Sequence, residues 1–265
     1  MAIRTSRPRP MSGPESADDG EQSFLSHLVE LRSRLIKCVA VVLLILVGLI
    51  PFANRLYGVL AMPLLERLPA GGLMIATDVA SPFFAPLKLA FFVAVFIAMP
   101  FILYQLWAFV SPGLYRHEKR LAVPLLASSV ALFYLGCAFA YFLVLPAVFT
   151  FMTSVAPEGV AVMPDISRFL DFALILFLAF GICFEVPVAL VILVAIGMVS
   201  PDQLVKSRPY TIVGAFVVAA ILTPPDVLSQ LLLAIPMCLL YEVGIVAARV
   251  VSRRGAAAEP TPSDG

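Results

Sequence analysis

Six apolar runs separated by polar loops constrain the fold of this chain more than any other feature. They cover residues 35–52, 85–110, 121–152, 172–199, 210–222 and 227–251. A helix needs about 20 residues to cross roughly 30 Å of hydrocarbon, so the first four runs can each span a membrane. The fifth is only about 20 Å long as a helix, and Glu242 interrupts the sixth. We therefore predict six transmembrane helices, of which the last two are short.

Composition supports this assignment. Hydrophobic residues make up 61% of the chain and charged residues 13%, whereas soluble domains are roughly half apolar and a quarter charged. The four cysteines all lie within apolar runs and lack the spacing of a zinc site or a disulfide framework. The net charge of +1 says little by itself, because the distribution of charge matters more than the sum. We predict a polytopic membrane protein with no nucleic-acid partner.

The basic residues indicate the orientation. With six spans, most Lys and Arg residues fall on the side that holds both termini, the 2–3 loop and the 4–5 loop. Because basic residues accumulate on the cytoplasmic side, both termini are expected there, in a multi-pass protein of the cytoplasmic (inner) membrane. The other side holds only Arg55, Arg67, Arg168 and, just inside a span, Lys88.

The remaining segments complete the predicted architecture. Residues 1–22 and 252–265 read as disordered cytoplasmic tails around a membrane domain at 23–251. The outer loops at 54–68 and 78–86 carry helix-like apolar patterns, which predict a cap of short helices on the outer rim. Prolines within the spans favour kinked helices and a curved, concave bundle.

Catalytic signatures are absent from the sequence. The only histidines are His27 and His117, and both lie at the predicted cytoplasmic edge. There is no phosphate-binding loop, no zinc-protease motif and no nucleophile elbow. We expect neither an enzyme nor a bound cofactor or metal.

The stretch from Ser23 to Lys37 is amphipathic and leads directly into the first span. It predicts a surface-lying helix that holds the Glu30 carboxylate at the water boundary, surrounded by cations. Glu30 lies four residues before Arg34, so the two side chains can form an ordinary ion pair on one helix face. That pair alone would account for Glu30.

Glu118 offers a second carboxylate on the same side, in the loop before the third span. On its own it can be a first-turn acid stabilised by the helix dipole. Considered together, Glu30 and Glu118 suit a ligand with two adjacent cations. A guanidinium matches a carboxylate in a two-pronged fork, whereas an ammonium does not.

Glu185 lies near the middle of the fourth span, where a charge costs on the order of 2.5–3.5 kcal/mol by insertion scales. It either faces a wet cavity on the concave side or is protonated and bonds to the Cys183 carbonyl that Pro187 frees. Three polar residues near the junction of the fifth and sixth spans, which we call the polar group, can form turn caps or contact another protein's helix. Its members are Thr223, Ser229 and Gln230.

At these residues the chain resembles the TatC family of twin-arginine protein translocase subunits. The similarity follows the chain in order across all six spans. Lys119-Arg120 stands where the family usually has an Arg-Arg pair, and neither tail carries a family pattern. The matching runs are Phe24-Leu-Ser-His-Leu-Val-Glu-Leu-Arg32, Ala76-Thr-Asp-Val-Ala-Ser-Pro-Phe-Phe84, Tyr104-Gln-Leu-Trp-Ala-Phe-Val-Ser-Pro112, His117-Glu118, Phe184-Glu-Val-Pro187 and Leu222-Thr-Pro-Pro-Asp226.

The resemblance implies a core receptor that binds twin-arginine signal peptides and nucleates export of folded proteins, driven by the proton-motive force. Glu30 and Glu118 would hold the arginine pair, with Arg32 and Phe109 in the surrounding site. Glu185 would line the intramembrane pocket. The polar group of Thr223, Ser229 and Gln230 would contact TatA- and TatB-type single-span partners, within a larger, self-associating complex in membrane lipid.

A secondary transporter is the alternative reading, with Glu185 as its proton or substrate site. Single-span partners that co-purify with the chain would favour the translocase. Uptake of a small solute by the chain alone would favour the transporter.

Overall fold

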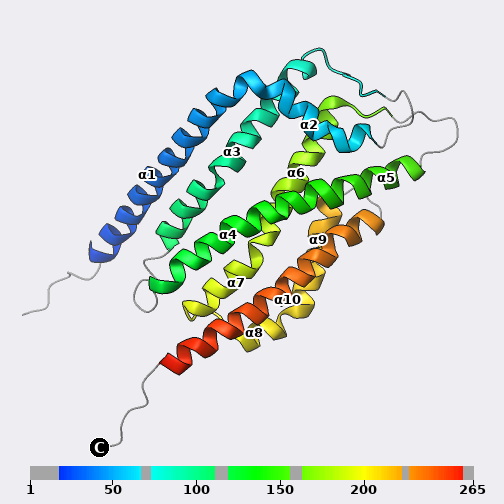
Figure 1. Cartoon of the computed structure of the whole chain (residues 1–265). Coiled ribbons are helices and arrows are strands. Elements are labelled where there is room, and N and C mark those ends of the chain that lie inside the picture. The colour runs from blue at the N-terminus through cyan, green and yellow to red at the C-terminus, as the bar shows by residue number, and fades with distance from the viewer. Residues whose placement is uncertain (1–17, 67–72, 111–118, 156–162, 223–226, 259–265) are drawn as a thin grey trace, which may run out of the picture.

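The computed structural model describes residues 18–66, 73–110, 119–155, 163–222 and 227–258. Within these ranges the regular elements are helices, apart from one isolated bridge between Ile75 and Asp165 (Figure 1). Five helical segments are long and apolar enough to cross a membrane, and Arg208–Leu222 is a shorter apolar helix. The predicted all-helical membrane fold with a short fifth span is confirmed. The sixth span, predicted to be short, is instead 24 residues long and can cross a membrane, because the helix continues past Glu242.

The first helix differs from its prediction. α1 runs without a break from Asp18 to Leu49, so the amphipathic stretch continues straight into the first span and is not a separate surface-lying helix. No proline or glycine occurs between residues 23 and 47 that could interrupt it. The helix also begins inside the stretch predicted as a tail.

A turn at Pro51 redirects the chain at the opposite end of α1. The 3₁₀ turn Ile50–Phe52 leads into α2, Ala53–Leu65, which confirms that the loop predicted at 54–68 contains a helix. The second predicted rim helix, at 78–86, is wrong, because residues 81–86 form the start of α3, Ser81–Val110. Pro86 lies inside α3, in its second turn, where it leaves one ladder hydrogen bond unmade.

Two spans are interrupted at their prolines. In the third, α4 (Lys119–Phe139) passes through one π-helical stretch into α5 (Leu145–Val155) just before Pro146. In the fourth, α6 (Ile166–Phe184) ends at Glu185, and α7 (Val186–Ala195) follows with Pro187 in its first turn. Proline cannot donate the ladder hydrogen bond, which explains both positions.

The chain then folds back through a short helix. Gly197 takes a positive φ of 75° after α7, a conformation that glycine adopts at little cost. α8, Pro201–Lys206, follows with Ser200 and Gln203 in a reciprocal capping box. α9 spans Arg208–Leu222, and α10, Val227–Ala258, continues into the predicted C-terminal tail.

Close helix contact holds the centre of the bundle. A Cβ at Gly136 of α4 would lie 2.5 Å from the Phe180 carbonyl oxygen of α6, and one at Gly181 would lie 2.5 Å from the Phe133 ring. The two glycines therefore allow α4 and α6 to pack backbone against side chain. Phe133 and Phe180 are fully buried beside them.

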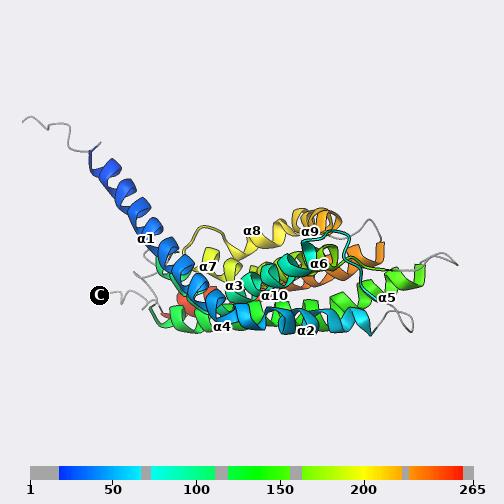
Figure 2. The same cartoon turned by 90° about the horizontal axis from the view of Figure 1, so that it is seen from above.

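The helices are grouped around this contact. α3 packs against α1, α2, α4 and α6, while α10 packs against α7 and α9. Seen from above, α1 diverges from the remaining helices, and α4 and α9 lie on opposite sides of the bundle (Figure 2). The start of α1 and the end of α10 lie at the same end of the molecule, together with the end of α3 and the start of α4 (Figure 1).

Candidate signal-recognition site and intramembrane polar groups

Arg34 connects the predicted Glu30 site to α3. Its Nε and Nη2 donate to the same oxygen, Oε1 of Glu30, at 2.9 and 2.6 Å. Its Nη1 donates to Oε1 of Gln105 at 2.9 Å, and Nη2 also reaches the Ala108 carbonyl at 3.3 Å. The ion pair anticipated from the sequence is therefore present, but it is one part of a link between two helices.

This link fixes Glu30 at the end of α3 and leaves it accessible. The Glu30 side chain is 42% exposed and that of Arg34 22% exposed, while Gln105 is buried. Within the described residues, both contacts of the Glu30 carboxylate fall on Oε1. A carboxylate has about four acceptor positions, so Oε2 retains capacity for another donor.

The other predicted members of this site are placed less closely. Phe109 is half-buried near the end of α3, next to Ala108. Arg32 is exposed, and its two-residue offset from both Glu30 and Arg34 directs it away from their shared helix face. Glu118 lies outside the described residues.

Glu185 forms a contact that the sequence did not indicate. The Ser129 hydroxyl of α4 donates to Oε2 of Glu185, while Oε1 is buried without a hydrogen-bond partner in the described structure. The Cys183 carbonyl accepts instead from the backbone N–H of Glu185 itself. The alternative of a side-chain bond to Cys183 is not found in the described structure, because Oε2 of Glu185 accepts from Ser129 and Oε1 has no partner.

Gln230 connects the last two spans. Its Nε2 donates to the Phe216 carbonyl of α9 at 3.1 Å. Ser229 lies in the first turn of α10, and Thr223 lies outside the described residues. The amide of Gln230 thus serves a contact within the chain.

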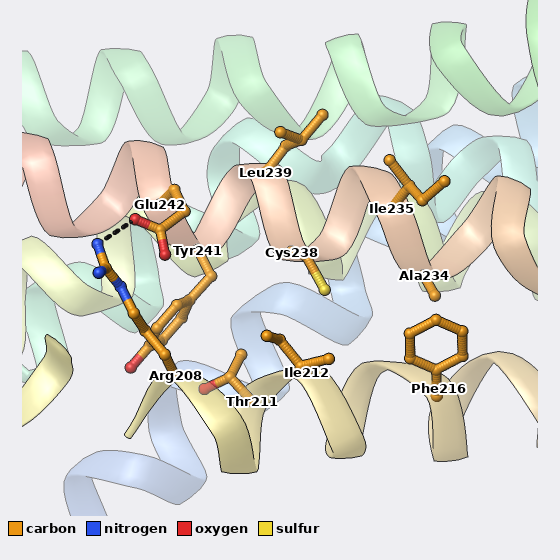
Figure 3. Close-up of a pocket in the computed structure, with 10 residues that line it drawn as sticks. All are labelled: Arg208, Thr211, Ile212, Phe216, Ala234, Ile235, Cys238, Leu239, Tyr241 and Glu242. Carbon is orange, nitrogen blue, oxygen red and sulfur yellow. Dashed lines mark hydrogen bonds and ion pairs between the residues drawn. The ribbon is translucent and has the colours of Figure 1, made fainter. Parts of the chain in front are cut away.

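A mostly apolar cavity of about 240 Å³ lies between α9 and α10, next to this contact. Figure 3 shows Thr211, Ile212 and Phe216 of α9 facing side chains of α10. An ion pair borders it, with 2.6 Å between Nη2 of Arg208 and Oε2 of Glu242. Sequence reasoning missed this pair, although opposite charges at the same end of consecutive spans were a usable signal.

Charged groups also fix the end of the bundle where α2 lies. Asp165 caps α6 by accepting from the backbone N–H groups of Ser167 and Arg168, and it accepts from both the N–H and the hydroxyl of Thr77. The Thr77 hydroxyl, followed by the backbone donors, holds the pKa of the Asp165 carboxyl well below its usual range. The pair Ile75 and Ile166 adds a backbone hydrogen bond of 2.9 Å alongside.

The described part of the chain holds no cluster of three or more His, Cys, Asp or Glu side chains arranged to bind a metal. The carboxylates found here are single groups that accept from hydroxyl, backbone N–H or guanidinium donors. Such groups suit recognition of a charged ligand and the joining of helices.

Comparison with known proteins identifies the family. Residues 26–236 match the family model of the Sec-independent protein translocase protein TatC. The chain belongs to the TatC family. It is accordingly a multi-pass membrane subunit of a twin-arginine protein translocase, which works with other subunits of that system.

Named relatives agree along nearly the whole chain. The TatC protein of Haemophilus influenzae is 55% identical over 231 residues, covering 87% of this chain and 90% of the relative. That of Escherichia coli K12 is 54% identical over 234 residues, covering 88% and 91%. A crystal structure described as the twin arginine translocase receptor TatC aligns with a TM-score of 0.75 at 40% identity, covering 86% of this chain and all of the other.

Proposed function

We propose that this TatC chain is the core receptor for twin-arginine signal peptides and that Glu30 and Glu118 bind the paired arginines. The observation that carries the proposal is the Glu30 carboxylate. One of its oxygens is fixed by Arg34 and the other keeps acceptor capacity, on a side chain that is 42% exposed. A guanidinium from a peptide can approach Oε2 without displacing Arg34.

The binding free energy of the signal peptide comes from charged contacts and from apolar contacts in unequal parts. A hydrogen bond to a charged group is worth about 1.5–3 kcal/mol, and exposed ion pairs have a median of about 0–1 kcal/mol. Two partly solvent-exposed contacts, one from Glu30 and one from Glu118 to the paired arginines, therefore correspond to roughly millimolar affinity for the peptide. The arginines select the peptide, and the apolar segment of the signal supplies most of the remaining affinity by lying along the bundle.

The other predicted site residues act beside the binding of the arginine pair or after it. Arg32 and Phe109 belong to the surrounding site, and Glu185 lines the intramembrane pocket used after docking. Thr223, Ser229 and Gln230 contact TatA- and TatB-type single-span partners in a self-associating complex. The Gln230 carbonyl oxygen supports this role, because only its NH₂ group has a described bond to the neighbouring helix.

The proposed setting is the cytoplasmic membrane, with both termini on the cytoplasmic side and the proton-motive force as energy source. The arrangement of basic residues supports this orientation. Membership in a family of protein translocases favours the export of folded proteins over the alternative function, a small-solute transporter that uses Glu185.

The test is photo-crosslinking of a twin-arginine signal peptide to membranes that contain single and double Gln variants of Glu30 and Glu118. We expect crosslinking and export to fall in each variant while the amount of protein in the membrane stays the same. Glu66→Gln, an exposed carboxylate at the end of α2, is the matched control and should behave as wild type. Wild-type crosslinking in the Glu30 and Glu118 variants would refute the binding role.

A further inference from the structure

An ion pair joins α3 and α6 within the membrane-crossing part of the molecule, apart from the sites described above. Nζ of Lys88 lies 2.5 Å from Oδ1 of Asp171, and the two side chains are 49% and 48% exposed. Charged side chains inside membrane spans are costly and mark functional positions unless they are fully paired and buried. Here both ends of the pair stay open to the surroundings.

The depth of this pair matches the base of a lipid headgroup layer. Lys88 lies seven residues after the start of α3 at Ser81, and Asp171 five residues after the start of α6 at Ile166, or about 10 and 8 Å along the helix axes. The 30 residues of α3 span about 45 Å, the full thickness of a bilayer with its headgroups. Its hydrocarbon core takes about 30 Å of this, so each headgroup layer is roughly 5–8 Å deep.

Apolar hollows lie on both sides of the pair. One, of about 650 Å³, is formed by α1, α3 and α6 and includes Leu46, Phe84 and Phe91. The other, of about 200 Å³, lies between α3 and α6 and includes Leu174 and Leu178. Lys88 and Asp171 line both hollows, so a polar head held at the pair could extend apolar chains into each.

The pair also retains the hydrogen-bonding capacity that such a head requires. The Lys88 ammonium has three donors, and one described contact uses only one of them. In the described structure Oδ2 of Asp171 accepts no hydrogen bond, since its contact with Lys88 uses Oδ1. An anionic oxygen can therefore approach Lys88 while an N–H donor approaches Asp171.

We propose that Lys88 and Asp171 form a binding site for a phospholipid whose headgroup carries both a phosphate and a primary ammonium, as phosphatidylethanolamine does. The phosphate accepts from Lys88, and the ammonium donates to Asp171. Phosphatidylglycerol offers the phosphate without a cation. A choline headgroup has a cation without N–H donors, so neither satisfies both ends of the pair.

The experiment measures lipid retention by native mass spectrometry on the full chain, purified in detergent and supplied with equal amounts of phosphatidylethanolamine and phosphatidylglycerol. Wild type is expected to retain the ethanolamine lipid with about tenfold preference, the effect of one charge-assisted contact. Asp171→Asn should lose or invert this preference, and Lys88→Met should lower retention of both lipids. Lys88→Arg keeps the charge and the donors and should retain the preference.

Two controls separate binding from a structural role of the pair. Glu242→Gln breaks a comparable ion pair between other helices and should leave the lipid preference unchanged. A phosphatidylethanolamine with a photoactivatable acyl chain should label peptides containing residues 84–91 or 170–178 in wild type, and much less in Lys88→Met/Asp171→Asn. Unchanged preference in Asp171→Asn, or labelling that the double variant does not alter, would overturn the proposal even if the variants were less stable.

Discussion

Arg34 of α1 donates to Gln105 of α3 across 2.9 Å while holding Glu30 on its own helix. Gln105 is buried, so the amide oxygen that accepts this bond is fixed by packing. α1 is otherwise largely exposed, with little of its length buried against the bundle. Farther along, α1 packs against α3 through Val42, Ala94 and Ala98, so the Arg34 bridge is the described contact that orients the Glu30 side chain itself.

Gln105→Met should weaken signal-peptide recognition although Gln105 is not expected to touch the peptide. The change removes the acceptor for Nη1 of Arg34, and a hydrogen bond to a charged group is worth about 1.5–3 kcal/mol, less where the group is partly exposed, as Arg34 is. We expect crosslinking of a twin-arginine peptide to fall by up to about tenfold at an unchanged protein level. Gln105→Glu keeps an acceptor oxygen and should retain crosslinking; an equal loss in both variants would contradict a positioning role.

The crossing of α4 and α6 should tolerate no methyl group at Gly136. In Gly136→Ala the new Cβ meets the Phe180 carbonyl oxygen at 2.5 Å, and backbone atoms there cannot rotate away. We expect a loss of about 1–3 kcal/mol of stability, measured by thermal unfolding in detergent. Gly214→Ala on α9 has no atom within 4 Å and serves as the control, with an effect of about 1 kcal/mol or less.

The spans could be predicted because long apolar runs are local, one-dimensional signals. The continuity of α1 was missed because an amphipathic pattern indicates which face is polar and not whether the helix bends before the membrane. The second predicted rim helix failed for a related reason, since the apolar pattern around Phe83 and Phe84 fits the start of a span equally well.

The Glu30–Arg34 pair could be predicted from its spacing on one helix. Partners that lie on other helices could not, because they are set by how helices distant in sequence are packed. Glu185 was recognised as unusual, yet its contact with Ser129 depends on the close approach of α4 and α6 that two glycines allow. Lys88 and Asp171 are 83 residues apart and meet only once α3 and α6 are side by side. Sequence therefore located Glu185 and Lys88, whereas Asp171 and the contacts of all three became visible only in the fold.

Stability at acidic pH should depend on Asp165. Its pKa in the folded chain is lowered by the hydrogen bonds from Thr77 and from the start of α6. The carboxylate therefore contributes stability above its unfolded pKa of about 3.9, and this contribution is lost as the pH falls through the lower, folded value.

The measurement compares the unfolding temperatures of wild type and Asp165→Asn in detergent from pH 7 to pH 3. Wild type should be the more stable at pH 7, and the difference should shrink below about pH 4. Thr77→Val removes the strongest donor to Asp165. In a Thr77→Val background, Asp165→Asn should therefore lower the unfolding temperature by less than it does in wild type at every pH. A difference that stays constant with pH would contradict the assignment.

A late defect in export is expected for Glu185→Ala. The side chain lies in the bundle, away from the bridge that holds Glu30, so signal-peptide crosslinking and membrane assembly should remain normal while export falls. Pulse–chase export of a folded substrate, measured beside crosslinking in the same membranes, separates the two steps. Normal export would leave Glu185 with a structural role alone.

The contact between Ser129 and Glu185 should be energetically coupled. Ser129→Ala leaves both carboxyl oxygens of Glu185 without a described partner, which costs about 1–3 kcal/mol when the group is buried. In a Glu185→Leu background the hydroxyl has lost its acceptor already, so the same serine change should cost much less. A double-mutant cycle of unfolding free energies should therefore give a coupling of about 1 kcal/mol or more. Additive effects would show that the hydroxyl and the carboxyl do not stabilise each other, and Glu185 would then need another partner in the assembled translocase.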